Sequence, residues 1–389
     1  MKKNLFVMGS LVLSLLLFVN CTKKSDSTAT TAGSDSQSEI LVGEYGSLTG
    51  SEATFGVSTN KGIKLAFDEI NNTGGINGKK IKLITLDDQG KPEEAAQVVT
   101  RLITQDKVVA VIGEVASGRS LAAAPIAQQY KVPMISPSST NPKVTQVGDY
   151  IFRVCFLDPF QGTVMARFAI ENLKVKKLAV LRDVKSDYSV GLADFFVQKA
   201  KELGAEIVAD VSYAAGDNNF KAQLTKIKTA NPEAIFVPGY YTEVGLIAKQ
   251  VKELGLNAVL LGGDGWDSSK LSEIGGTAVD GNYFSNHYSS DDKATEVVDF
   301  VTKFKSKYSG ETPDGLAALG YDAANILVKA MKQLKEVNPK NIRDELAKIK
   351  DFKGVTGMIS INENRDAVKS AVVVKVEGKN NKFVTTFTP

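Results

Sequence analysis

The sequence predicts an α/β protein with two doubly wound lobes, and three observations support this fold class. Short apolar runs alternate with helix-period segments, which is typical of parallel sheets covered by helices on both faces. The alternation forms two separate series, one over residues 40–136 and one over residues 178–261. Helices and then strands follow the second series, which indicates that the chain crosses between the lobes more than once.

The first series begins after a polar N-terminal tract. Ile63, Phe67 and Ile70 recur at helical spacing and predict one buried helix face. Pro92 opens another helix, because proline is tolerated in a first turn. The predicted strands are Ile40–Tyr45, Ile81–Leu86, Val108–Ile112 and Val132–Ser136, and the predicted helices are Asn60–Asn72, Pro92–Asp106 and Leu121–Tyr130.

The second series shows the same alternation of strands and helices, and further helices and strands follow it. The predicted strands are Leu178–Arg182, Glu206–Val211, Ala234–Val237 and Ala258–Leu261, alternating with helices at Val190–Leu203, Phe220–Ala230 and Val244–Leu254. Helices at Thr295–Tyr308, Leu316–Leu334 and Pro339–Ile349 come next, then strands near Met358–Ile361, Ala371–Val376 and Phe383–Phe387. From Glu39 onward the chain is long enough for two domains of ordinary size.

The N-terminus has the pattern of an export signal. Lys2 and Lys3 precede an uncharged apolar run, Leu5–Val19, which is short for a membrane span. This arrangement predicts a signal peptide over residues 1–20. A buried N-terminal helix or a short membrane anchor is the alternative.

Cys21 follows the apolar run directly. The segment Phe18–Cys21 resembles a lipoprotein signal, with Asn20 at a position where Gly, Ala or Ser is usual. Residues 22–38 contain no large apolar side chain, so this tract cannot fold by burial and predicts a flexible tether. We expect a lipid on Cys21, which would anchor an exported protein to a bacterial membrane through the tether at 21–38.

Cysteine content and net charge argue against a disulfide-stabilised fold and against a nucleic-acid-binding protein. Cys155 is the only cysteine besides Cys21, so we expect no intramolecular disulfide. The net charge falls from +3 to +1 when Lys2 and Lys3 leave with the signal peptide. This balance gives no electrostatic basis for a nucleic-acid partner.

The segment Val108–Ser120, VVAVIGEVASGRS, raises the question of a nucleotide site. It matches the phosphate-binding loop G-x-x-x-x-G-K-[ST] except that Arg119 replaces the lysine. No convincing magnesium-binding aspartate follows a predicted strand, and an exported protein has little access to ATP. A strand followed by a helix N-terminus still favours an anion. Ser117 either caps this helix or contacts a ligand, and the residues alone leave both open.

Three further loops follow predicted strands, where ligands bind in open α/β sheets. They read Ser136–Pro142 (SPSSTNP), Gly239–Glu243 (GYYTE) and Gly262–Asp267 (GGDGWD). Hydroxyls, tyrosines and Asp264 suit a polar cleft, whereas ordinary polar turns are the simpler alternative.

No catalytic group converges in the sequence. His287 is the only histidine, so neither a histidine triad nor a two-histidine metal site can form. We expect His287 at the surface. We expect no enzyme activity, no cofactor and no metal.

Several segments together resemble one known family. GSLTGSEATFG, NNTGGINGKKIKLITLDDQGKPEEA, VIGEVASGRS, MISPSSTNP, FRVCFLDPFQG and GGDGW occur in this order. They resemble the periplasmic leucine/isoleucine/valine-binding proteins, the substrate-binding components of branched-chain amino acid ABC transporters. The resemblance covers essentially all of the chain after the tether.

The resemblance implies a type I periplasmic binding protein, with two Rossmann-like lobes joined by three crossovers and closing on the ligand like a hinged trap. The crossovers would lie near Leu157, Asn286 and Val355. Lobe 1 would then comprise 39–157 plus 287–354, and lobe 2 would comprise 158–286 plus 355–389.

The resemblance also implies how a zwitterion is held. Ser117 would donate to the ligand carboxylate from the helix N-terminus. Ser138 would offer its backbone N–H to the carboxylate and its C=O to the ammonium group. Thr140 would bond through its N–H and hydroxyl, and Ser139 belongs to the same loop. Asp264 would pair with the ammonium group, directly or through a water.

The remaining residues implied to contact the ligand surround it with aromatic and apolar side chains. Tyr188 and Tyr240 match tyrosines that close over the ligand. Phe55, Val115 and Ala116 match positions of the side-chain pocket. Trp266 stands where smaller residues are common in the family, and we expect it to narrow or reshape that pocket.

The implied function is capture of a branched-chain or other apolar amino acid and its delivery to ABC transporter permease subunits. The protein would act as an extracytoplasmic, lipid-anchored monomer. An amide, urea or short-peptide binder on the same fold is the close alternative. A ligand-sensing module for a partner receptor is the alternative from another class.

Overall fold

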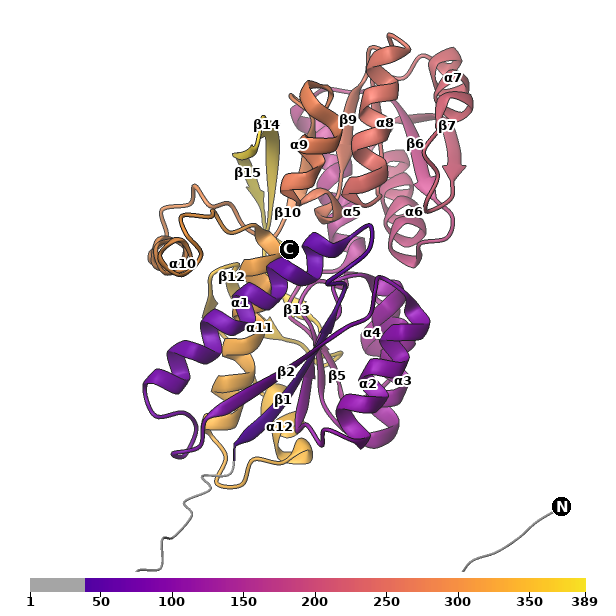
Figure 1. Ribbon diagram of the computed structural model, residues 1–389. Coiled ribbons are helices and arrows are strands. Elements are labelled where there is room, and N and C mark those ends of the chain that lie inside the picture. Colours follow the sequence, from indigo (N-terminus) through magenta and orange to yellow (C-terminus); the bar gives the residue numbers. More distant parts are fainter. Residues whose placement is uncertain (1–38) are drawn as a thin grey trace, which may run out of the picture. The chain divides into compact units, whose positions relative to one another are not determined.

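Two sheets of mainly parallel strands carry the fold in the computed structural model, which describes residues 39–389 (Figure 1). The predicted signal peptide, Cys21 and the predicted tether lie outside the described residues. Within residues 39–389, no helix is both long and apolar enough to cross a bilayer. The predicted α/β class is confirmed, because strands alternate with helices in both lobes.

The first lobe contains a parallel sheet in the order β2-β1-β3-β4-β5. Its elements are β1 (Ile40–Gly46), α1 (Ala53–Asn72), β2 (Ile81–Asp87), α2 (Pro92–Thr104), β3 (Ala110–Ile112), α3 (Ser117–Tyr130), β4 (Met134–Ser136), α4 (Lys143–Gln146) and β5 (Ile151–Arg153). Later in the chain it gains α10 (Thr295–Lys307), α11 (Gly315–Lys332), α12 (Pro339–Leu346) and a small sheet of β11 (Phe352–Gly354), β12 (Gly357–Ile361) and β13 (Ala367–Val368).

The second lobe contains a sheet in the order β15-β14-β10-β9-β8-β6-β7, in which β14 runs antiparallel to both of its neighbours. Its elements are α5 (Asp158–Arg167), β6 (Lys177–Asp183), α6 (Asp187–Glu202), β7 (Glu206–Tyr213), α7 (Lys221–Ala230), β8 (Ala234–Phe236), α8 (Tyr241–Glu253), β9 (Val259–Gly262), α9 (Ser269–Gly275), β10 (Tyr283–Asn286), β14 (Ala371–Glu377) and β15 (Asn380–Phe387).

The chain crosses between the two sheets three times. It leaves β5 for α5 through residues 154–157 and returns after β10. We expected the third crossing near Val355, but strand pairing puts it after Lys369, between β13 and β14. The reason is that β11–β13 stay with the first lobe, where Asp366 accepts a 2.7 Å hydrogen bond from Arg153 Nε.

Several helices begin before their predicted starts, and several short elements have no predicted counterpart. α1 begins at Ala53 and α3 at Ser117, each earlier than predicted. Polar residues in these first turns dilute the apolar periodicity, although Phe55 is buried there. β5 has no counterpart among the predicted strands, because three residues give no periodic signal.

Short central strands are buried on both faces. In β3, Ala110 and Ile112 join one core cluster while Val111 joins another, as the two-residue period of a strand requires. In β8, Ile235 and Phe236 divide between two clusters in the same way. These strands fix the starting points of the loops that follow them.

Helices α1 and α11 pack side by side against one face of the first sheet (Figure 1). Glycines allow this close approach. A methyl carbon added at Gly62 would lie 2.0 Å from the carbonyl oxygen of Ala317, and one added at Gly320 would lie 2.4 Å from that of Thr59. Both helices begin at the junction of the lobes, so their packing positions the residues at their N-termini.

We predict that Gly62→Ala destabilises the fold by at least about 2 kcal/mol, because overpacking forces the two backbones apart. Thermal and urea unfolding measure the change. Gly118→Ala is the matched control, since its added carbon would meet nothing closer than 3.6 Å and alanine favours a helix. Equal stabilities for the two variants would contradict the packing argument.

Candidate ligand-binding site

The candidate site is a small cavity where loops of both lobes meet. The first lobe contributes residues on α1, on α11 and after β3 and β4, and the second lobe contributes residues on α6 and after β8 and β9. The lining residues are Phe55, Val115, Ser138, Tyr188, Tyr240, Asp264, Gly265 and Leu316. The cavity has a volume of about 10 Å³, roughly that of one water, and all lining residues except Tyr240 are buried. A small molecule therefore reaches it only when the lobes separate.

Aromatic side chains close the cavity from both lobes. Phe55 meets Tyr240 edge to face at 5.4 Å and Tyr241 at 5.2 Å between ring centroids. Tyr188 stacks on Tyr240 at 5.3 Å. Edge-to-face and offset pairs of this kind are favourable beyond the area they bury. Together with Val115 and Leu316, Phe55 forms an apolar wall on the first-lobe side.

Asp264 is the acid of the cavity and is bonded on both carboxylate oxygens. Its Oδ1 accepts from Gln161 Nε2 at 2.8 Å and from the Tyr188 hydroxyl at 2.9 Å. Its Oδ2 lies 3.0 Å from His287 Nε2 and 3.3 Å from the Ser138 hydroxyl, which belongs to the other lobe. Burial alone would raise the pKa of Asp264, but the hydrogen bond and electrostatic attraction of His287, followed by the hydrogen bonds from Gln161 and Tyr188, outweigh burial and lower it. Asp264 is therefore an anion aimed at the cavity.

A buried charge network shapes the loop between β3 and α3. Arg119 pairs with Glu114 at 3.1 Å and with Glu52 at 2.7 Å. Glu114 also accepts bonds from the backbone N–H and hydroxyl of Ser47. The charge of Arg119 is thus neutralised within the protein. Arg119, at the position of the lysine in a phosphate-binding loop, is already paired with these two acids.

Ser117 is the first residue of α3 and not its cap. The N-cap is Ala116, and the Ser117 hydroxyl instead accepts a hydrogen bond from Asn141 N at 3.3 Å. The capping interpretation of Ser117 is therefore wrong. The first amides of a helix have no partner within it, so Ser117 and Gly118 keep N–H groups for an anion at this end.

The loop Ser138–Thr140 divides its polar groups between the cavity and the scaffold. Ser138 lines the cavity. The Ser139 hydroxyl lies 2.9 Å from the carbonyl oxygen of Glu114 and 2.8 Å from the Ser120 hydroxyl, and so joins this loop to the β3–α3 loop. Thr140 is fully buried and its carbonyl accepts from Asp158 N at 3.0 Å.

Asp158 is a second buried acid near Asp264. Its carboxylate has no hydrogen bond of normal geometry among the described residues, although the Thr140 hydroxyl is close enough to favour the ionised form. Burial raises the pKa of Asp158 to about 8, and the nearby charge of Asp264 adds to this effect. Of the two acids, only Asp264 has its charge compensated by donors.

Two side-chain pocket predictions differ from the structure. Trp266 is 1% exposed and lies in the second-lobe core, where its Nε1 donates to Val237 O at 3.0 Å. It packs against Gly262 and Phe284 and does not line the cavity. Ala116 is also buried outside the lining set, because its backbone turns into α3 there.

His287 is not at the surface, and its predicted exposure is wrong. It is 2% exposed because it follows β10 at the second crossover and bonds Asp264. Gln161 and Leu316 also belong to the site without having been predicted. Gln161 lies within the family-like segment FRVCFLDPFQG, and His287 directly follows Asn286, where a crossover was predicted. The sequence therefore contained features from which both residues could have been assigned to the site.

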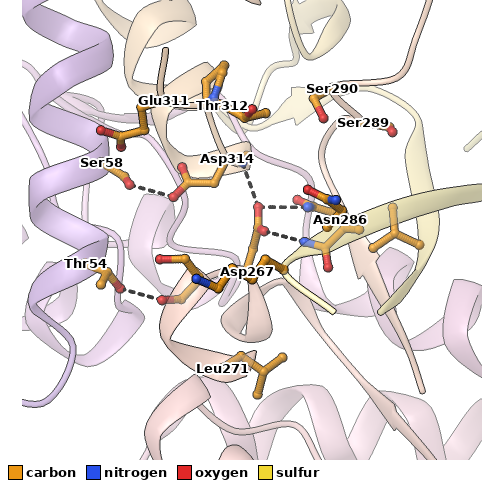
Figure 2. A pocket seen from close by; sticks show the side chains of 18 of the residues that line it. Thr54, Ser58, Asp267, Leu271, Asn286, Ser289, Ser290, Glu311, Thr312 and Asp314 are labelled. Atoms are coloured by element: carbon orange, nitrogen blue, oxygen red, sulfur yellow. Dashed lines mark hydrogen bonds between the residues drawn. The ribbon is translucent and has the colours of Figure 1, made fainter. Parts of the chain in front are cut away.

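A larger cavity of about 840 Å³ lies along the hinge, between α1, α11 and the residues after Trp266 (Figure 2). Two acids that line it are held by neighbours: the partly buried Asp314 by the Ser58 hydroxyl at 2.5 Å, and the buried Asp267 by Asn286 Nδ2 at 2.8 Å and Gly315 N at 2.6 Å. Burial, and then the charge of Asp267, raise the pKa of Asp314 to about 7. These acids brace the hinge. Among the described residues, no cluster of His, Cys, Asp and Glu is arranged to hold a metal ion.

Comparison with known proteins agrees with this geometry. A family model described as periplasmic binding protein matches residues 39–382. The chain belongs to this family. A Leu/Ile/Val-binding protein homolog 1 from Brucella suis biovar 1 (strain 1330) is 32% identical over 336 residues, which cover 86% of this chain and 89% of that protein.

Solved structures of the family have the same architecture. The leucine-binding protein LivK from Thermotoga maritima MSB8 superposes with a TM-score of 0.86 and 42% identity, covering 90% of this chain and 99% of that one. LivJ from Streptococcus pneumoniae, solved in complex with isoleucine, gives a TM-score of 0.84 and 37% identity, covering 89% and 99%. The predicted family and fold are thereby confirmed. These relatives are binding proteins and not enzymes, as the sequence predicts.

We predict that Asp158→Asn makes the protein relatively more stable as the pH rises. A folded pKa of about 8 against an ordinary value of 3.8 means that the wild type loses stability as pH rises from the lower to the higher value. The asparagine variant escapes this loss. Urea unfolding at pH 4 and pH 8 should show its advantage growing by at least about 1 kcal/mol. Parallel pH profiles for the two proteins would contradict the assignment.

Proposed function

We propose that this protein captures a branched-chain or other apolar amino acid by lobe closure and delivers it to the permease of an ABC transporter. We also propose that it works outside the cytoplasm, anchored through a lipid on Cys21. Its membership of the periplasmic binding protein family supports this location. The leucine- and isoleucine-related relatives support the ligand class.

One observation carries the proposal: a single cavity is lined from one lobe by Val115, which lies just before the N-terminus of α3, and by Ser138 of a hydroxyl-rich loop, and from the other lobe by the acid Asp264. A zwitterion needs N–H or O–H donors for its carboxylate and an anion for its ammonium group. The N-terminus of α3 and Ser138 provide the first, and Asp264 provides the second. The proposed roles of Ser117 and Thr140 follow from their places in the two loops beside the cavity.

The wall formed by Phe55, Val115 and Leu316 suits an aliphatic side chain. Each buried methylene contributes about 0.8 kcal/mol. This wall therefore favours leucine, isoleucine and valine over glycine or polar amino acids.

We predict that calorimetry of the chain from residue 21, carrying Cys21→Ser, detects binding of aliphatic amino acids. Acetamide and urea should bind more weakly, because a neutral ligand gains nothing from a buried acid. Dipeptides carry an ammonium group, but they should bind more weakly because the small closed cavity leaves no room for a second residue. The proposal is wrong if only these neutral or peptide ligands bind. Preferred binding of dipeptides would point to the alternative function on the same fold.

Asp264→Asn should weaken amino acid binding at least tenfold, which corresponds to about 1.4 kcal/mol. The variant keeps the size of the side chain and removes its charge. Asp299→Asn, on an exposed position of α10, is the charge-matched control and should bind like the wild type. Unchanged affinity in Asp264→Asn would remove this acid from the ammonium site.

The anchor is tested separately in cells. Wild-type protein should partition with membranes and incorporate a labelled fatty acid, whereas Cys21→Ser should do neither and should be recovered as exported soluble protein. Fatty-acid incorporation by Cys21→Ser, or its absence from the wild type, would refute lipidation at this position.

A further inference from the structure

The only histidine of the chain lies at the centre of the lobe junction. His287 follows β10 at the second crossover, and its ring stacks on Phe156 of the first crossover at 3.8 Å between centroids and 21° between planes. Its Nε2 lies 3.0 Å from Asp264 Oδ2. His287 therefore connects two of the three crossovers to the acid that lines the cavity.

The protonation state of this pair follows from its surroundings. Asp264 is ionised and can only accept, so Nε2 of the ring must carry the proton that it donates. Burial lowers the pKa of His287 to about 4, against the opposing influence of Asp264. At neutral pH the ring is thus an uncharged donor. Its Nδ1 makes no hydrogen bond to any described residue.

We propose that His287 is a positioning residue that orients the Asp264 carboxylate for the ligand ammonium group, links it to the hinge, and makes ligand capture sensitive to acid. The inference rests on the proposed function. Gln161 and Tyr188 hold Oδ1 from α5 and α6, while His287 holds Oδ2 from the crossover. The plane of the Asp264 carboxylate is then fixed relative to the hinge. A ligand that binds Asp264 is linked to the hinge through the imidazole ring of His287.

Acid sensitivity follows from charge. A proton on Nδ1 places a cation beside Asp264, which competes with the ligand ammonium for the same carboxylate. Asp264 itself keeps its charge under these conditions, because its pKa is lowered. Affinity should therefore fall as the pH drops through the titration of His287.

Other charged groups around the pair do not change the sign of this effect. Lys369 faces His287 and opposes its protonation. The other titratable groups that act on this pair or on its immediate neighbours are Asp158, Cys155, Arg153, Tyr188 and Asp267. All of these groups are present both in the wild type and in the His287 variants. Their own titrations therefore cancel when the pH dependence of binding is compared between these proteins.

Nuclear magnetic resonance can test the pair directly, since a single histidine gives a single set of imidazole signals. The sample is the chain from residue 21 with Cys21→Ser, labelled with ¹⁵N-histidine and carrying no histidine tag. We expect the Nε2–H tautomer at pH 7, titration below pH 5, and a change of the ¹⁵N shifts in Asp264→Asn. Titration at the ordinary value near 6.5, or signals indifferent to Asp264→Asn, would overturn the proposal.

Binding measurements then test the positioning role. His287→Leu keeps apolar bulk but removes the donor, and we expect at least a tenfold loss of amino acid affinity at pH 7. His287→Gln offers an amide N–H in place of Nε2–H and should recover part of this loss. Between pH 6 and pH 4 the wild type should lose about twofold in affinity relative to His287→Gln, which has nothing to protonate.

Equal affinity of His287→Leu and the wild type, or identical pH profiles for wild type and His287→Gln, would refute the positioning role. If His287→Leu does not fold, the comparison of wild type with His287→Gln and the resonance data still decide. If the wild type binds no amino acid, the proposed function fails, and adding leucine will not move the imidazole signal. The Asp264→Asn spectrum still reports whether the His287–Asp264 pair exists.

Discussion

The structure around the cavity depends on the requirement that a buried carboxylate be matched by donors. Asp264 is 5% exposed and has donors from α5, α6, the second crossover and the opposite lobe. Leaving such a charge unpaired would cost several kcal/mol, so the elements that supply these donors cannot move independently of it. This requirement explains why residues far apart in sequence meet here. Of the four donors to Asp264, only Ser138 belongs to the opposite lobe, and its 3.3 Å hydrogen bond is the weakest. This bond would therefore break when the lobes separate, whereas the other three donors lie in the same lobe as Asp264 or in the hinge.

A second buried charge group sets the chemistry on the other side of the cavity. Arg119, Glu114 and Glu52 compensate one another beneath the β3–α3 loop, and breaking such a group by removing one partner typically costs about 3–5 kcal/mol. Because Arg119 is committed to this structural role, the proposed anion site at the start of α3 would rely on backbone amides and hydroxyls. Neutral donors with a partial helix dipole suit one carboxylate, whereas a triphosphate needs full cations. The loop thus resembles a phosphate-binding loop in backbone pattern and differs from it in charge.

The period of the apolar residues could predict the fold, because strands such as β3 and β8 are buried on both faces and read as continuous apolar runs. Loops after those strands could be predicted as a site for the same topological reason. Side-chain direction could not be predicted. Trp266 turns into the core because its indole N–H finds the carbonyl of Val237, and His287 is buried because Asp264 needs a donor. Such pairings join residues that are distant along the chain, so they have no local sequence signal.

If the protein works by the proposed lobe closure, the balance between open and closed forms depends on the bonds that join the lobes away from the cavity. Direct bonds across the junction include Thr54 to Ser268 at 2.9 Å, Thr242 to the carbonyl of Ser51 at 2.8 Å, and Asn141 to the carbonyl of Asp187 at 2.9 Å. Each contributes only about 1 kcal/mol, because water replaces the partner when the lobes part. Closure also costs conformational freedom of the hinge. A ligand that bonds Asp264 from one lobe and the α3 amides from the other interacts fully only with the closed form. Its differential affinity is therefore what shifts the population.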